Sequence, residues 1–186
     1  MLADRHWWVD QSSVPAQRHR RGSGTGCTGH VRANRFSGPS GGRGTSVLLR
    51  IFATHFGTEQ PAVIEALVAL TAHQRLNLVV LSGDITQRAR PSQFCAAKAF
   101  VDRLGAPVLA IPGNHDIAPL DLWARLARPY AGYSAVFGGE LEPVHDTADL
   151  LVVGVNTTRA WRHKNGEVSP AQIERVAQRL SAACAA

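Results

Sequence analysis

Three short, predominantly apolar runs constrain the fold of this chain more than any other feature of its sequence. They cover residues 47–52, 78–81 and 108–111, and two segments with helical periodicity, at about 61–70 and 91–104, separate them. Strands that are apolar along their whole length are typical of a parallel sheet that is covered on both faces. The alternation of strand and helix therefore predicts an α/β fold, a layered α/β/α sandwich with right-handed crossover connections.

The second half of the sequence gives weaker signals, apart from its last helix. We expect a short helix at about 120–128, strands near 134–137 and 150–155, and a helix that begins at Pro170. Ser169 is the expected N-cap residue, because a Ser followed three residues later by Gln forms a capping box. No strand pattern follows this helix, so that we expect the domain to be incomplete at its C-terminus. The helix has an apolar stripe that predicts its buried face, formed by Ile173, Val176, Ala177 and Leu180.

The first 45 residues differ from the rest of the chain in composition and charge. They contain eight of the 17 glycines and seven Arg against two Asp, whereas residues 46–186 are close to neutral, so that most of the net charge of +6 lies in the first segment. A segment this poor in apolar residues cannot bury enough surface to offset its loss of conformational entropy. We predict a disordered basic tail over 1–45 and one partial domain over 46–186. Such a tail makes nucleic acid a candidate partner, because clustered Arg residues bind phosphate backbones without sequence specificity.

Composition also excludes several classes of protein. No apolar run approaches the roughly 18 to 20 residues that span a membrane, and no secretory signal is visible, so that a membrane is not an expected partner and the cytoplasm is the expected location. The three cysteines are widely spaced and odd in number, which excludes a disulfide framework or a zinc knuckle.

Polar residues follow each of the three predicted parallel strands. His55 follows the first strand, Asp84 the second, and Asn114 and His115 the third, each beside a glycine. Ligands of open parallel sheets bind beyond the carboxyl ends of the strands, so that these side chains are expected to share one pocket. Imidazole, carboxylate and amide groups suit divalent metal ions, and a carboxylate such as that of Asp84 can bridge two ions about 3.5 to 4 Å apart. Such a pair of ions activates a water molecule for attack on phosphorus.

These motifs resemble those of a known enzyme family. Gly-Asp at 83–84 and Gly-Asn-His-Asp at 113–116 resemble the second and third motifs of the calcineurin-like metallophosphoesterases. Thr-His-Phe-Gly at 54–57 resembles the end of the first motif of that family, an Asp-x-His. Asn-Thr-Thr-Arg at 156–159 resembles the branch that contains cyclic-nucleotide phosphodiesterases and related repair-type nucleases. The resemblance covers about residues 46–182.

The resemblance implies a phosphoester substrate, two divalent metal ions (Mn, Fe or Zn) and a role for each matching residue. His55 is expected to bind the first ion, Asp84 to bridge both ions and Asn114 to bind the second. His115 is expected to act on the phosphoryl group or the leaving group, and Asp116 to orient His115. The implied activity is phosphodiesterase or phosphatase hydrolysis.

Two departures from the family pattern weaken this expectation. Ala53 lies where the first motif of the family has Asp, and a methyl group cannot coordinate a cation. The family also draws further His ligands from a later strand end and a Gly-His-x-His motif, and neither follows Leu180. We therefore expect weak or incomplete metal binding and little or no turnover. Two alternatives stay open: a non-catalytic fragment, and a nucleic-acid-binding module that uses the basic arm.

Overall fold

The computed structural model of the chain describes residues 30–36, 46–118, 122–162 and 165–185. Within them, a four-stranded sheet has the order β1-β2-β3-β4, and a second, two-stranded sheet pairs β5 with β6. The strands of the larger sheet are β1 (His30–Phe36), β2 (Ser46–Phe52), β3 (Leu78–Ser82) and β4 (Val108–Ile111). The predicted parallel pairing of the three apolar strands β2, β3 and β4 is confirmed.

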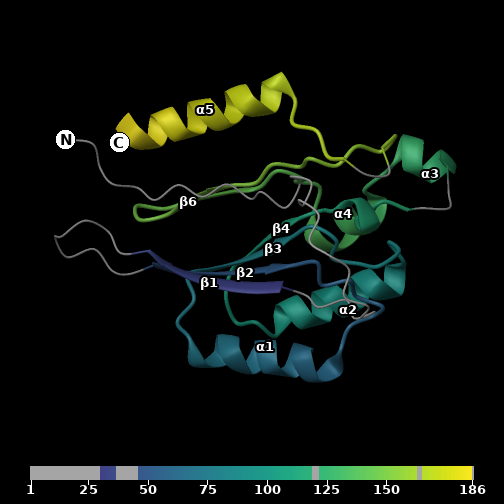
Figure 1. Cartoon of the computed structure of the whole chain (residues 1–186), viewed down its shortest axis with the longest axis horizontal. Helices are drawn as coiled ribbons and strands as arrows, with labels where there is room; N and C mark the ends of the chain where they lie inside the picture. The colour runs from purple at the N-terminus through teal and green to yellow at the C-terminus, as the bar shows by residue number, and fades with distance from the viewer. Residues whose placement is uncertain (1–29, 37–45, 119–121, 163–164, 186) are drawn as a thin grey trace, which may run out of the picture.

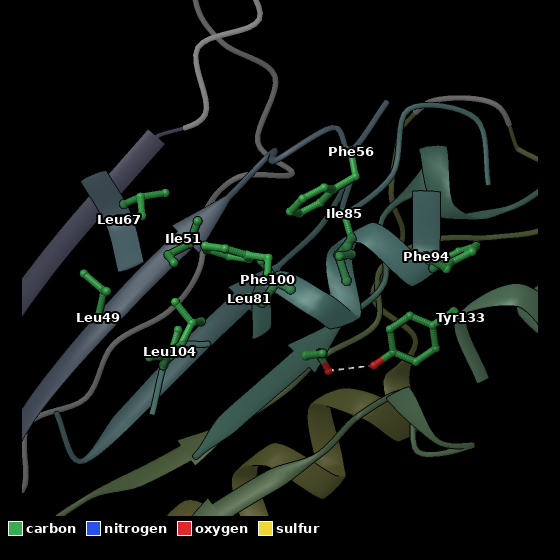
Figure 2. Packing of buried hydrophobic residues seen from close by; sticks show 13 residues of the cluster. Leu49, Ile51, Phe56, Leu67, Leu81, Ile85, Phe94, Phe100, Leu104 and Tyr133 are labelled. Carbon is green, nitrogen blue, oxygen red and sulfur yellow. Dashed lines mark hydrogen bonds between the residues drawn. The ribbon is translucent and has the colours of Figure 1, made fainter. Parts of the chain in front are cut away.

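Helices α1 (Pro61–His73) and α2 (Pro91–Asp102) connect the parallel strands. The chain moves in the same direction across the sheet at both crossovers, from β2 to β3 and from β3 to β4. Right-handed crossovers in one direction place both helices on the same face of the sheet, as Figure 1 shows. The main core lies between these helices and the sheet (Figure 2); its largest fully buried side chains include Leu49, Ile51, Leu81, Ile85, Phe94 and Tyr133.

The opposite face of the larger sheet is covered by the second sheet. Side chains alternate between the faces of a strand, so that Leu48 in β2 points away from the helices and packs with Leu78, Val80 and Leu109. Leu150 and Val152 complete this smaller cluster from β6 (Leu151–Val153) and the residue before it, and β5 (Val144–Asp146) pairs with β6. Helix α5 (Pro170–Ala185) lies outside this sheet (Figure 1). The α/β class is therefore confirmed, with a second sheet inserted between the larger sheet and α5.

The prediction that residues 1–45 are disordered is wrong for His30–Phe36, which form β1. This strand pairs antiparallel with β2 along all seven of its residues. Backbone N–H and C=O groups at the edge of β2 stabilise this strand. Backbone hydrogen bonds do not depend on side-chain identity, so that the side-chain pattern of 30–36 does not predict them. Residues 1–29 and 37–45, the rest of the predicted tail, lie outside the described residues.

The strand predicted near 134–137 is also wrong, because residues Ala131–Phe137 form helix α4. Tyr133, Val136 and Phe137 have the i, i+3, i+4 spacing of a helix, and this spacing places Tyr133 in the core and packs the other two against it. The predicted short helix at 120–128 corresponds to α3 (Leu122–Ala127). Its position after the third strand was predicted correctly from the sequence.

Helix α5 has the predicted start but not the predicted buried face. Ser169 and Gln172 form the expected capping box: the Gln172 N–H donates to Ser169 Oγ at 3.3 Å, and the Ser169 N–H donates to Gln172 Oε1 at 2.8 Å. Of the predicted apolar stripe, however, Ile173 is 59% exposed and Ala177 is exposed. The helix rests on a sheet of only two short strands, which is too small to cover the stripe. Among the described residues, no helix combines the length and apolar character that a membrane span requires.

The buried hydroxyl of Tyr133 is expected to stabilise the junction of α4 and β4. It donates a hydrogen bond to the carbonyl of Ala110 at 2.8 Å (Figure 2), and burial raises the pKa of Tyr133 so that the hydroxyl stays protonated. Tyr133→Phe leaves that carbonyl without its buried donor and is expected to lower the free energy of unfolding by about 1.5 kcal/mol. Tyr130→Phe, which removes a partly buried hydroxyl bonded to Thr158 Oγ1, is the matched control and should have a smaller effect in urea denaturation. Equal losses in the two variants would contradict this role.

Candidate metal centre

The loops after β2 and β3 are held side by side by backbone hydrogen bonds that extend beyond the strands. The N–H of His55 donates to the carbonyl of Asp84 at 3.0 Å, and the N–H of Phe56 donates to the carbonyl of Ile85 at 2.8 Å. The N–H of Gln87 in turn donates to the carbonyl of Phe56 at 3.0 Å. The structure thus brings His55 and Asp84 together, as the parallel sheet predicted.

Four non-glycine residues of these two loops have a left-handed backbone, among them Ala53, His55 and Asp84. The φ angles are 53° at Ala53, 46° at His55 and 47° at Asp84. This conformation costs non-glycine residues about 1 to 2 kcal/mol each, although Asp and Asn tolerate it better than Ala does. Backbone strain of this kind collects at functional sites, where the surrounding structure holds it in place. Ala53 therefore has a backbone conformation that suits the Asp of the family motif better than it suits Ala.

The loop after β4 packs directly on Asp84. A Cβ atom at Gly113 would lie 2.0 Å from the backbone nitrogen of Asp84 and 2.3 Å from its Oδ1, so that only glycine allows this approach. The N–H of His115 donates to Asp84 Oδ1 at 3.1 Å. Asn114 lies directly before His115, at the start of a 3₁₀ turn that spans Asn114–Asp116. All three predicted loops therefore meet at Asp84.

The two histidines of the site lie edge to face. Their ring centroids are 5.0 Å apart, with an angle of 86° between the ring planes. Nδ1 of His115 lies 3.0 Å from the backbone carbonyl of Gln87. A carbonyl oxygen only accepts hydrogen bonds, so that Nδ1 carries the proton and donates. This contact leaves Nε2 as the ring atom of His115 that is available to a substrate.

His55 has the properties of a metal ligand. Its Nδ1 is buried and has no hydrogen-bond partner among the described residues. Burial lowers the pKa of His55, Asp84 raises it, the nearby His115 lowers it, and the side chain of Gln87 raises it; burial is the largest of these effects. A lowered pKa favours the neutral imidazole, which is the form that binds metal ions.

Asp116 has a structural role that differs from the predicted one. Its carboxylate is fully buried and accepts four hydrogen bonds, none of them from the ring of His115. The donors are the N–H groups of Ile85, Thr86 and Gly113 and the hydroxyl of Thr86, at 2.7 to 3.0 Å. Burial raises the pKa of Asp116 to about 6, against the opposing effect of these donors. Asp116 therefore ties the loop after β3 to the loop after β4, and the carbonyl of Gln87 fixes the ring of His115 instead.

Gln87 and Gln93 also stabilise the site, although no residue pattern indicates either of them. Gln87 acts on His115 through a backbone carbonyl, which any residue carries. Oε1 of Gln93, in the first turn of α2, accepts hydrogen bonds from the N–H groups of Arg88 at 2.9 Å and Arg90 at 3.3 Å. The Gln93 amide also lies over Gly57, where an added Cβ would come within 2.0 Å of Nε2. Gln93 thus connects the loop after β2 to the loop after β3.

The donor set of the described residues is partial. His55 and Asp84 lie together with the segment of Asn114, but Ala53 supplies no donor atom. Over the ranges that the structure describes, no group of three or more His, Cys, Asp or Glu side chains could hold a metal ion. The unpartnered Nδ1 of His55 suits one ion. These residues do not fit a complete two-ion centre.

The comparison with protein families agrees with the arrangement of the three loops. A family model described as calcineurin-like phosphoesterase matches residues 46–173, which is more than half of the chain and includes every loop of the site. None of the curated proteins compared with the chain matches it. The chain therefore belongs to the calcineurin-like phosphoesterases.

Proposed function

We propose that this domain binds a phosphodiester at the loops after β2, β3 and β4, and that it hydrolyses it slowly because its metal centre is incomplete. The proposal rests on one observation, the convergence of His55, Asp84 and His115. The ring of His115 lies against the ring of His55, and its N–H donates to the carboxylate of Asp84. Membership of a family that generally uses divalent metal ions supports the same chemistry.

In this proposal, His55, Asp84 and Asn114 bind metal, and His115 acts on the substrate. A bound ion would polarise a phosphoryl oxygen and lower the pKa of a water molecule. His115 is already oriented, because its Nδ1–H donates to the carbonyl of Gln87. In its protonated form, Nε2 donates to a phosphoryl oxygen or protonates the leaving oxygen.

The surroundings of the site favour an anionic substrate. Arg88 follows Gln87 directly and Arg90 lies two residues further on. Both are exposed, and neither forms an ion pair with a carboxylate of the described residues. Their backbone N–H groups donate to Gln93 Oε1, so that both side chains extend from a loop whose backbone is fixed. Unpaired cations beside a half-buried site raise the local concentration of anions. The resemblance of residues 156–159 to the phosphodiesterase branch supports a diester as the anion.

Ala53→Asp is expected to strengthen metal binding, because it adds a carboxylate in a backbone conformation that Asp tolerates. We expect Mn²⁺ to bind about tenfold more tightly or better in titration calorimetry, which corresponds to about 1.4 kcal/mol. The rate of bis(p-nitrophenyl) phosphate hydrolysis with Mn²⁺ should rise with it. Ala53→Gly is the matched control, since it relieves the same left-handed strain at φ 53° without adding a ligand.

Two outcomes would contradict the proposal. The first is hydrolysis by the unmodified chain at the rate of the Ala53→Asp variant, because the metal centre would then need no carboxylate at this position. The second is undiminished hydrolysis after His115→Ala in the Ala53→Asp background, because His115 would then take no part in the reaction.

A further inference from the structure

A tight turn before α5 exposes a tryptophan next to α3. Trp161 is 71% exposed, and Leu126 of α3 is 59% exposed. We use the name Trp161 surface for these two residues together with Arg125 and Arg128, in and just after α3, and Arg159 and Arg162 of the turn. Figure 1 shows the segment before α5 running beside α3, which follows the loop of Asn114 and His115 in the chain.

The turn that carries Trp161 is fixed by hydrogen bonds from Arg125 to the residues before and after the tryptophan. Nε of Arg125 donates to the carbonyl of Ala160 at 2.6 Å, and its Nη2 donates to the carbonyl of Arg162 at 3.2 Å. Within the turn, the N–H of Arg162 donates to the carbonyl of Arg159 at 3.0 Å. Because the backbone of the turn is already fixed, it loses little conformational freedom when the tryptophan binds, which favours affinity.

The Trp161 surface is cationic. Arg162 pairs with Glu167 at 3.2 Å, but no carboxylate of the described residues pairs with Arg125, Arg128 or Arg159. Arg125 and Arg159 instead donate to neutral carbonyl and amide oxygens. These bonds satisfy the guanidinium donors but do not neutralise their charge. The surface therefore attracts a polyanion.

We propose that the Trp161 surface binds single-stranded nucleic acid, with a base stacked on Trp161 and the phosphodiester backbone against the arginines. A platform for stacking combined with cations is the usual arrangement in proteins that bind single strands. A lipid surface would require a wider apolar face than Trp161 and Leu126 provide. The inference rests on the proposed phosphodiester hydrolysis. Together, the two proposals make a polymeric phosphodiester the substrate class of this domain.

The test is binding of a fluorescently labelled twelve-nucleotide oligo(dT) to the full chain, measured by anisotropy over a salt series in EDTA. Trp161→Ala is expected to weaken binding about tenfold at fixed salt, and Trp161→Phe less, because the Phe ring retains part of the stacking on a base. Arg128→Ala should lower the slope of log K against log salt by about one. Arg75→Ala is the matched control: Arg75 is exposed, has no ion pair with a described carboxylate, and lies before β3 at the opposite end of the strands.

Unchanged affinity in a Trp161→Ala variant that melts at the wild-type temperature would overturn the proposal. So would equal effects of Arg128→Ala and Arg75→Ala on the salt slope. If Trp161→Ala lost binding to anionic phospholipid vesicles while its affinity for oligo(dT) stayed unchanged, the surface would be assigned to a membrane instead. The assay requires no turnover, so that failure of the Ala53→Asp hydrolysis experiment and failure of this one are distinguishable.

Discussion

Gly113→Ala is expected to lower the free energy of unfolding by about 3 kcal/mol and to abolish whatever metal binding the site has. The added Cβ would lie 2.0 Å from the backbone nitrogen of Asp84, 2.3 Å from its Oδ1 and 2.8 Å from its Cα. Two of these atoms are backbone, so that no side-chain rotation relieves the overlap and the two loops must separate. Separation would also break the hydrogen bond from the His115 N–H to Asp84 Oδ1. Guanidinium denaturation gives the loss of stability, and calorimetry with Mn²⁺ gives the loss of binding.

Gly139→Ala is the control for Gly113→Ala. Gly139 is exposed, and an added Cβ would meet no atom within 4 Å. Its expected effect is within about 0.5 kcal/mol, because the substitution only changes the conformational freedom of the unfolded chain. Comparable stability of the two variants would show that the approach of Gly113 to Asp84 is not a constraint on the fold.

Asp116→Ala is expected to lower the free energy of unfolding by about 3 kcal/mol. The substitution leaves the buried N–H groups of Ile85, Thr86 and Gly113 without an acceptor, and each such group costs about 1 to 3 kcal/mol. Relief of the buried charge offsets part of this loss, since burial raises the pKa of Asp116. Asp116→Asn keeps one acceptor oxygen without the charge, so that it should lose less than Asp116→Ala. Asp102→Ala, which removes an exposed partner of Lys98, should lose under about 0.5 kcal/mol.

The same carboxyl group is expected to give stability a pH dependence with a defined sign. Its pKa is about 6 in the folded chain, against 3.8 for the free side chain. Between these values the folded chain binds the proton more tightly than the unfolded chain does. Its contribution to stability is therefore complete below about pH 4 and lost as the pH rises through 6. The difference in unfolding free energy between wild type and Asp116→Asn should be larger at pH 4.5 than at pH 7; a constant difference would contradict this assignment.

Side-chain patterns determined the parallel part of the fold and the location of the site. The apolar runs and the helical periodicity between them define β2, β3 and β4 with their crossover helices, and the loops after these strands then meet at one edge of the sheet. The capping box of Ser169 and Gln172 was predictable for the same reason, since both partners lie within one turn of helix. Each of these features depends on short-range sequence, so that the printed residues alone were sufficient.

Three features depend on long-range contacts that no local pattern shows: the pairing of β1 with β2, the burial of Tyr133 in a helix, and the partners of Asp116. The first depends on backbone groups at a strand edge, which have the same chemistry in every residue. The others depend on contacts across the fold: Tyr133 bonds to Ala110, and Asp116 bonds to residues about 30 positions earlier. A sequence shows that a carboxylate is present but not which donors surround it. The role of Asp116 therefore emerged from the packing of two loops and not from its place in a motif.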